Sequence, residues 1–171
     1  MRTRNFIPLL FAVLCAAGSG QQPPSTSQSL TPERAAAIDK DVRAFLATVA
    51  HDVTAEGPAA WRKHFADDPA FFMAAEGQLV FPNSASATAG IEQLKRAIKH
   101  IELQWGDDLR VDPLTPELAA VATSYHEIRV SSAGNKVDET GFFTAITECR
   151  NGSWQFRNAH WSLAGPLRAV R

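Results

Sequence analysis

Two histidines in the C-terminal half of the chain, His126 and His160, are the side chains best suited to chemistry near neutral pH. An imidazole can accept or donate a proton close to pH 7. Asn158, two residues before His160, carries an amide that could hold a substrate oxygen. We therefore predict His160 and His126 as candidate catalytic residues. In the alternative interpretation, both imidazoles are polar groups satisfied by neighbouring hydroxyls and backbone.

Other signatures of catalysis or cofactor binding are weak. Asp67 and Asp68 could act as an acid and a base, but a helix end followed by Pro69 is where aspartates usually serve turns. No H-x-H, H-E-x-x-H or C-x-x-C spacing predicts a metal site. Neither a G-x-S-x-G motif nor a glycine-rich phosphate loop is present. We expect no metal and no cofactor.

The turn of the last hairpin predicts which residues share a face. Asn151-Gly152 is a strong signal for a two-residue turn, and it sets Arg150 opposite Ser153. Directly opposed residues lie on the same face of a sheet. One predicted face carries Gly141, Phe143, Ala145, Thr147 and Cys149 with Trp154, Phe156, Asn158, His160 and Ser162. The other carries Thr140, Phe142, Thr144, Ile146 and Glu148 with Gln155, Arg157, Ala159, Trp161 and Leu163.

The first of these faces has the composition of a pocket wall, because it is apolar with a few uncharged polar groups and one histidine. In the preceding strand, Glu127 and Arg129 share a face with Thr123 and Tyr125, which matches the charged face. This alternation places Ser124 and His126 on the pocket side, although a slip of one residue would reverse the assignment. The predicted pocket-lining residues are Asn158, Phe156, Phe143, Thr147, Ser124 and Trp61.

The second face holds the charges and is predicted to be the outer face of the sheet. Its apolar members Phe142, Ile146 and Trp161 form a larger patch than a monomer needs. We expect a homodimer through this face, although a C-terminal tail could cover it instead.

Helical patterns precede the strands. Thr31-Pro32 is typical of a helix start, and the apolar spacing from Ile38 to Val49 predicts a long amphipathic helix that ends near Gly57. A second, shorter helix starts at Pro58, and a third is expected after a cap at Thr88. A hairpin is predicted at 70–73 and 78–81, and longer strands at 103–111, 118–130, 137–150 and 154–163. Helices followed by an antiparallel meander predict an α+β fold.

The N-terminus is typical of an export signal. Residues 1–20 combine two arginines, a short apolar run and small residues, and the run is too short to span a membrane. Leu14 directly before Cys15 argues against a lipoprotein. We expect a signal peptide at 1–20, a spacer at 21–29, one domain at 30–165 and a tail at 166–171. The protein would then be periplasmic or secreted, without a membrane anchor after cleavage, and Cys149 would be a lone, buried cysteine.

Composition limits the classes of partner. The 171 residues include 17 basic and 18 acidic side chains, and removing residues 1–20 takes away two arginines and no acid. The remaining chain is mildly acidic and has no cluster of basic residues. Nucleic-acid binding is therefore not expected.

Two segments carry a resemblance to a known family. Trp61 to Gly77 (WRKHFADDPAFFMAAEG) and Asn151 to Ser162 (NGSWQFRNAHWS) resemble the SnoaL-like, ketosteroid-isomerase-like branch of the nuclear transport factor 2-like superfamily. The resemblance spans about residues 30–163 and implies a cone of curved, mostly antiparallel sheet closed by three N-terminal helices around an apolar pocket, often as a dimer. The aspartate base of the ketosteroid isomerases would fall within Phe72–Ala75, where no acid is present.

Taken together, these features predict an exported domain that binds a small, largely apolar molecule in a cone-shaped pocket. One alternative is an isomerase, dehydratase or cyclase that uses a pocket histidine for proton transfer. Another is a dimerising interaction module whose pocket is filled by its own aromatic residues.

Overall fold

The computed structural model describes residues 30–165. The predicted signal peptide, the spacer and the tail beyond residue 165 lie outside this range. The elements, in chain order, are α1 (Pro32–Glu56), a 3-10 turn (Pro58–Ala60), α2 (Trp61–His64), β1 (Phe72–Ala75), β2 (Gln78–Phe81), α3 (Ser84–Ala97), β3 (Ile98–Trp105), β4 (Arg110–Thr115), β5 (Leu118–Ser131), β6 (Lys136–Arg150) and β7 (Ser153–Leu163). The predicted α+β class is confirmed.

Helix α1 forms as its sequence predicts. The Thr31 side chain accepts a hydrogen bond from the backbone N–H of Arg34 at the first turn, and Gly57 ends the helix with φ of 78°. The buried residues recur every three or four positions and form one apolar stripe, namely Ile38, Val42, Leu46, Val49 and Val53. This stripe packs mainly against β3 and β4. None of the described helices is long and apolar enough to cross a membrane.

Helix α3 begins earlier than predicted. Asn83 caps it, and the side chains of Asn83 and Ser86 bond reciprocally to each other's backbone N–H. Thr88, the predicted cap, lies inside the helix and donates to the carbonyl of Ser84. The helix ends at Ala97, and the apolar residues from Ile98 onward belong to β3. The apolar spacing alone could not separate the end of the helix from the start of the strand.

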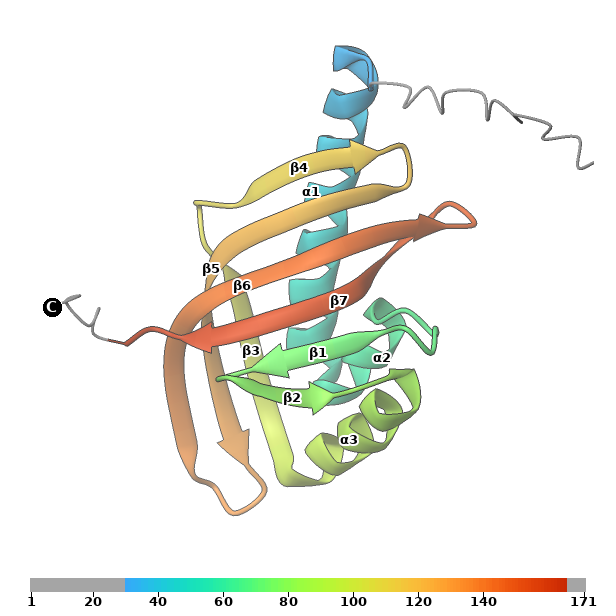
Figure 1. The fold of residues 1–171 in the computed structure, drawn as a ribbon. Helices are drawn as coiled ribbons and strands as arrows, with labels where there is room; N and C mark the ends of the chain where they lie inside the picture. Colours follow the sequence, from blue (N-terminus) through green and yellow to red (C-terminus); the bar gives the residue numbers. More distant parts are fainter. Residues whose placement is uncertain (1–29, 166–171) are drawn as a thin grey trace, which may run out of the picture.

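The sheet is mixed, curved and not closed into a barrel. Its strand order is β2-β1-β7-β6-β5-β3, and β4 pairs with β5 beyond this path. All neighbours are antiparallel except β1 and β7, which run parallel. Figure 1 shows α1 behind the sheet, while the long β5–β6 ribbon bends at its middle and descends beside β3. The helices therefore close one face of a curved sheet, and within residues 30–165 no helix lies over the opposite face.

A β-bulge in β7 changes the face on which His160 lies. Asn151 and Gly152 form the predicted turn with φ of 52° and 79°, and the predicted pairing holds as far as Thr147 with Phe156. The register then shifts, because Ile146 pairs with Asn158 and Arg157 is the extra residue. An extra residue reverses the alternation of side chains beyond it. Ala159 and Trp161 therefore face the helices, which corrects the predicted faces of the second half of β7.

The faces of β5 are also the reverse of the prediction. Thr123 pairs with Phe143 and is fully buried, whereas Ser124 pairs with the exposed Phe142. The charged residues misled the prediction because they are paired on the inner face, where Arg129 lies between Glu127 and Glu139. Charge alternation therefore did not mark the solvent side of this strand.

The core lies between the inner face of the sheet and the helices. Its centre is aromatic: Phe71, Phe143 and Phe156 are fully buried. The ring of Trp161 packs 4.5 Å from that of Phe143, between ring centroids, and the Trp105 ring donates a hydrogen bond to the carbonyl of Leu46 at 2.8 Å. Two further members of the aromatic group, Trp61 and Tyr125, also contact Trp161.

Candidate functional site

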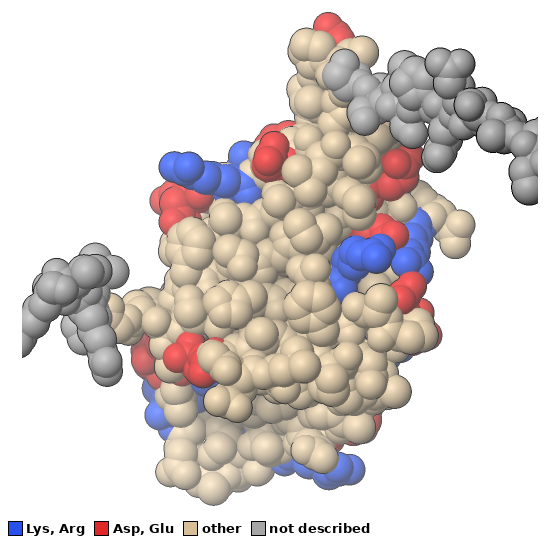
Figure 2. All heavy atoms as spheres, in the orientation of Figure 1, with Lys and Arg blue, Asp and Glu red and all other residues tan. Residues whose placement is uncertain are grey.

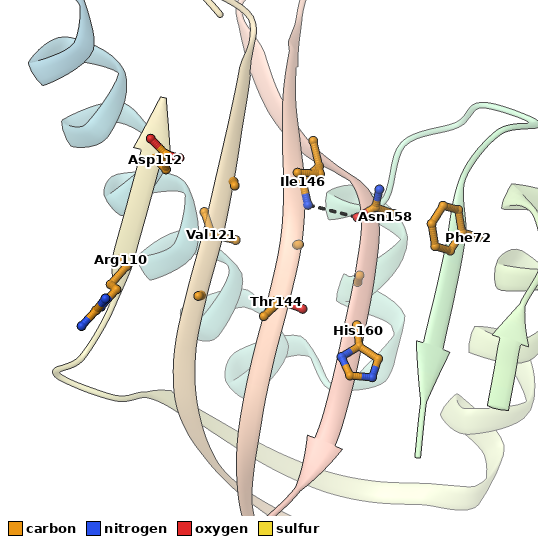
Figure 3. A pocket seen from close by; sticks show the side chains of 12 residues that line it. Phe72, Arg110, Asp112, Val121, Thr144, Ile146, Asn158 and His160 are labelled. Atoms are coloured by element: carbon orange, nitrogen blue, oxygen red, sulfur yellow. Dashed lines mark hydrogen bonds between the residues drawn. The ribbon is translucent and has the colours of Figure 1, made fainter. Parts of the chain in front are cut away.

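The predicted catalytic residue His160 lies on the outer face, over a shallow hollow with a volume of about 460 Å³. Two rows of paired residues cross this face, Asp112–Ala120–Ile146–Asn158–Phe72 and Arg110–Ala122–Thr144–His160–Ala74. Figure 3 shows His160, Thr144 and Asn158 on neighbouring strands, with α1 on the far side of the sheet. The small side chains of Ala120 and Ala122 on β5 leave room for this hollow.

Two of the predicted site residues, His160 and Asn158, line this hollow. His160 is exposed. Asn158 uses its Oδ1 to accept the backbone N–H of Ile146 at 3.1 Å, so this oxygen serves the bulge (Figure 3). Apolar atoms dominate the rest of the surface, and Figure 2 shows that charged side chains gather toward the edges of this face.

The second predicted histidine, His126, also lies on the outer side of the sheet, where it lines an open pocket of about 510 Å³ together with Ser124. The Nε2 of His126 lies 2.8 Å from Oδ1 of Asp138, and the imidazole is 40% exposed. Ser124 donates its hydroxyl to Asp108 at 2.8 Å. His126 and His160 are thus not brought together in the interior, and the predicted placement of His160, His126, Asn158 and Ser124 is corrected.

Four of the predicted pocket-lining residues do face the helices. Phe143, Phe156 and Thr147 are fully buried and form part of the packed core. Trp61 lines an open cavity. Cys149, expected to be buried, has intermediate exposure.

An inner cavity, partly open to solvent, lies under α3 and is lined by residues of α2, α3 and strands β1, β2, β5 and β7. Its volume is about 120 Å³. The lining residues are Trp61, Phe65, Met73, Phe81, Ile91, Leu94, Glu127 and Trp161. Seven of these eight side chains carry no charge, so Glu127 is the only ionisable group on the wall.

The carboxyl group of Glu127 is held away from water in this cavity. The residue is 9% exposed. Burial raises the pKa of Glu127 to about 7, the nearby Arg129 opposes this rise, and the carboxylate of Glu139 adds to it. A carboxyl with this pKa exists in both protonation states near neutral pH, so it can accept or donate a hydrogen bond or a proton there.

A second pocket, here called the mouth, adjoins the inner cavity and shares Met73 and Trp161 with it. Its volume is about 250 Å³. The lining residues are Met73, Ala75, Glu76, Tyr125, Arg129, Glu139, Trp161 and Leu163. The two pockets together run from the space under α3 to the bend of the β5–β6 ribbon.

The mouth is acidic and rigidly held. Arg129 Nε lies 2.8 Å from Oε1 of Glu127, and the same guanidinium donates to Glu139. Glu76 accepts the backbone N–H of Leu163. Burial and the carboxylates of Glu139, Glu127 and Glu76 raise the pKa of Tyr125 to about 12, so its phenol stays protonated as a potential hydrogen-bond donor.

Sequence reasoning missed Glu127, Arg129, Glu139 and Tyr125 because it assigned them to solvent. One signal could have indicated a paired cluster. Glu127 and Glu139 are like charges on directly opposed positions of β5 and β6, and a sheet tolerates such a pair when a cation such as Arg129 lies between them. Within residues 30–165, no group of three His, Cys, Asp or Glu side chains is arranged to hold a metal ion.

No protein-family model and no curated protein sequence matches the chain. Several solved structures match its fold. One is a nuclear transport factor 2-like superfamily protein from Salmonella enterica, which is 11% identical over 78% of this chain and 96% of its own, with a TM-score of 0.67. Another is a protein assigned as a scytalone dehydratase from Novosphingobium aromaticivorans, 10% identical over 82% of this chain and 94% of its own, with a TM-score of 0.68. A third is a hexachlorocyclohexane dehydrochlorinase, 13% identical over 79% of this chain and 92% of its own, with a TM-score of 0.61.

Proposed function

From the premise that this chain has the nuclear transport factor 2-like fold, we propose that it binds a small, largely apolar molecule in the inner cavity under α3. The observation that carries the proposal is the cavity itself, which is apolar on seven of its eight lining residues and offers the Glu127 carboxyl as its single ionisable group. Apolar walls with one or two placed polar groups are typical of small-molecule sites.

The size of the cavity limits the ligand. A cavity of about 150 Å³ holds one benzene ring in another protein. The inner cavity, at about 120 Å³, therefore suits one ring or a short branched chain, and the mouth gives room for a substituent of the ligand. The described interior is partly filled, because Phe143, Phe156 and Trp105 occupy its centre as the interaction-module alternative expected. Space remains open under α3, which supports the binding proposal.

Two of the structural neighbours are described as a dehydratase and a dehydrochlorinase, which supports a ligand-handling role for this fold. We do not extend the proposal to a reaction that uses His160 or His126, because both lie on the outer side of the sheet. Export from the cell remains part of the proposal and depends on residues 1–20.

Filling the cavity tests the proposed function. We expect benzyl alcohol to bind with a Kd on the order of 1 mM, as suits a ligand of this size. Leu94→Trp places a larger ring in the inner cavity and is expected to abolish binding. Binding is measured as saturable NMR shifts of the backbone amides of Ile91, Leu94 and Glu127.

The matched control is Leu114→Trp, because Leu114 lies on β4 and is 49% exposed. This variant should bind benzyl alcohol as the unaltered protein does. Undiminished binding in Leu94→Trp, with the variant folded, would show that the inner cavity is not the site.

A further inference from the structure

Among the described residues, the lining of the inner cavity includes one ionisable group, and that group is the carboxyl of Glu127. Glu127 projects into a space bounded by Trp61, Trp161 and apolar side chains, while its cationic neighbour Arg129 lines the mouth instead. A ligand that enters the cavity therefore meets a carboxylate and two indole rings. Both are groups that attract a cation, the carboxylate by its charge and the indoles by the negative faces of their rings.

The charges around the two pockets leave a net negative balance. Glu127 and Glu139 are directly opposed on β5 and β6, and Glu76 lies at the mouth. Among residues 30–165, Arg129 is the one basic residue on either wall. Its guanidinium contacts both Glu127 and Glu139. The Nε atom is buried and, although it lies 2.8 Å from Oε1 of Glu127, it makes no hydrogen bond of regular geometry. When Glu127 is ionised, one guanidinium faces three carboxylates, so a negative potential remains where the ligand enters.

We propose that the ligand of this site is a small amine that binds as its ammonium cation, with the ammonium group against Glu127 and its apolar part among the aromatic residues under α3. The proposal rests on the binding function proposed above and names the class of molecule. An ammonium would share the Glu127 carboxylate with Arg129 and leave no new buried charge unpaired. A carboxylate ligand would instead meet Glu127, Glu139 and Glu76 at short range.

Binding of a cation should strengthen as pH rises. The groups that face Glu127 are Arg129 and Glu139 on the sheet, with Tyr125 and Glu76 further along the mouth, and the residues lining the cavity from α2, α3, β1 and β2 are uncharged. Because the pKa of Glu127 lies at about 7, its carboxyl changes from largely neutral to largely ionised between pH 6 and pH 8. Benzylamine stays protonated across this range, so a change in its affinity reports the carboxyl.

The experiment compares three probes of similar shape: benzylamine, benzyl alcohol and benzoate. At pH 8 we expect benzylamine to bind about tenfold more tightly than benzyl alcohol, and benzoate to bind more weakly than either. Between pH 6 and pH 8 the affinity for benzylamine should rise several-fold, while that for benzyl alcohol should not rise. Affinities are measured by NMR titration of the intact domain.

Glu127→Gln keeps the shape of the side chain and removes its charge. In this variant benzylamine should lose its advantage over benzyl alcohol. The matched control is Glu92→Gln, which removes one negative charge from an exposed position on α3 and should leave the preference for benzylamine intact.

The outcomes separate this inference from the proposed function. If benzyl alcohol binds and benzylamine binds no more tightly, the amine proposal is overturned and the apolar binding site stands. Tightest binding of benzoate would also overturn it, since Arg129 would then select the ligand. If none of the three probes binds, both proposals fall.

Discussion

Glu127 shows how a single residue can carry the chemistry of the interior and also affect stability. A buried carboxyl whose pKa is raised from 4.5 to about 7 in the folded state holds a proton that the unfolded chain has released. Between pH 5 and pH 7 the unfolded state binds fewer protons than the folded state. The free energy of unfolding therefore falls as pH rises from about 5 through 7, and it stays lower above pH 7. Arg129 limits this loss by pairing with the ionised form.

Replacing Glu127 by Gln should therefore stabilise the domain at high pH. The quantity compared is the change in the free energy of unfolding that Glu127→Gln causes relative to the unaltered protein. We expect this change to be about 2 kcal/mol more favourable at pH 8 than at pH 5, because the neutral amide never has to ionise inside the core. Urea unfolding at the two pH values measures the difference. Glu92→Gln, at an exposed position on α3, serves as the control. A difference between Glu127→Gln and the unaltered protein that does not change with pH would contradict the prediction.

At the scale of the elements, the bulge in β7 decides which side chains reach the interior. The turn at Asn151-Gly152 sets the register of β6 and β7, but the extra residue Arg157 shifts it by one. From Asn158 onward the side chains of β7 therefore lie on the opposite faces from those predicted. The bulge is held on one side by Asn158, whose Oδ1 accepts the N–H of Ile146, and on the other by Arg157, whose guanidinium reaches Glu148 at 3.3 Å. Trp161 is thereby turned inward, where it forms the wall shared by both pockets.

Loss of the Asn158 oxygen should weaken the bulge. In Asn158→Ala the Ile146 N–H loses its acceptor, and we expect a cost of about 1 kcal/mol in the free energy of unfolding together with faster hydrogen exchange of the Ile146 amide. Asn158→Asp retains an oxygen at the same position and should exchange more slowly than the alanine variant. Equal exchange rates at Ile146 in all three proteins would show that this bond does not hold the bulge.

At the scale of the whole molecule, the outer sheet face has an apolar middle that no other segment covers within residues 30–165. Phe72 and Phe142 are 44% and 43% exposed on it, and Figure 2 shows few charged side chains over its middle. Trp161 was expected to belong to this surface but packs inside the domain, so the apolar part of the face includes Phe72, Phe142, Ile146, Ala120 and Ala122. The homodimer predicted from the sequence would use this face.

A charge in the middle of the outer face should prevent that dimer. We expect the protein to sediment as a dimer at micromolar concentration and Ile146→Asp to sediment as a monomer, because an unpaired carboxylate would be buried in the interface. Ala47→Asp changes an exposed residue of α1, on the helix-covered side of the sheet, and should remain dimeric. A monomer at all concentrations of the unaltered protein would contradict the prediction.

The sequence by itself determined the fold class, the long helix α1, the hairpin turn at Asn151-Gly152 and the apolar face that includes Phe143 and Phe156. These features depend on local chemistry: caps, turn residues and the spacing of apolar side chains. Only the tertiary structure decided which residues line the cavity. The bulge at Arg157 has no recognisable sequence signature. Because of this extra residue, His160 lies on the outer face of the sheet and Trp161 on the inner face. The charges of β5 pair with β6 across the sheet, so Glu127 is buried although its residue type is typical of a surface.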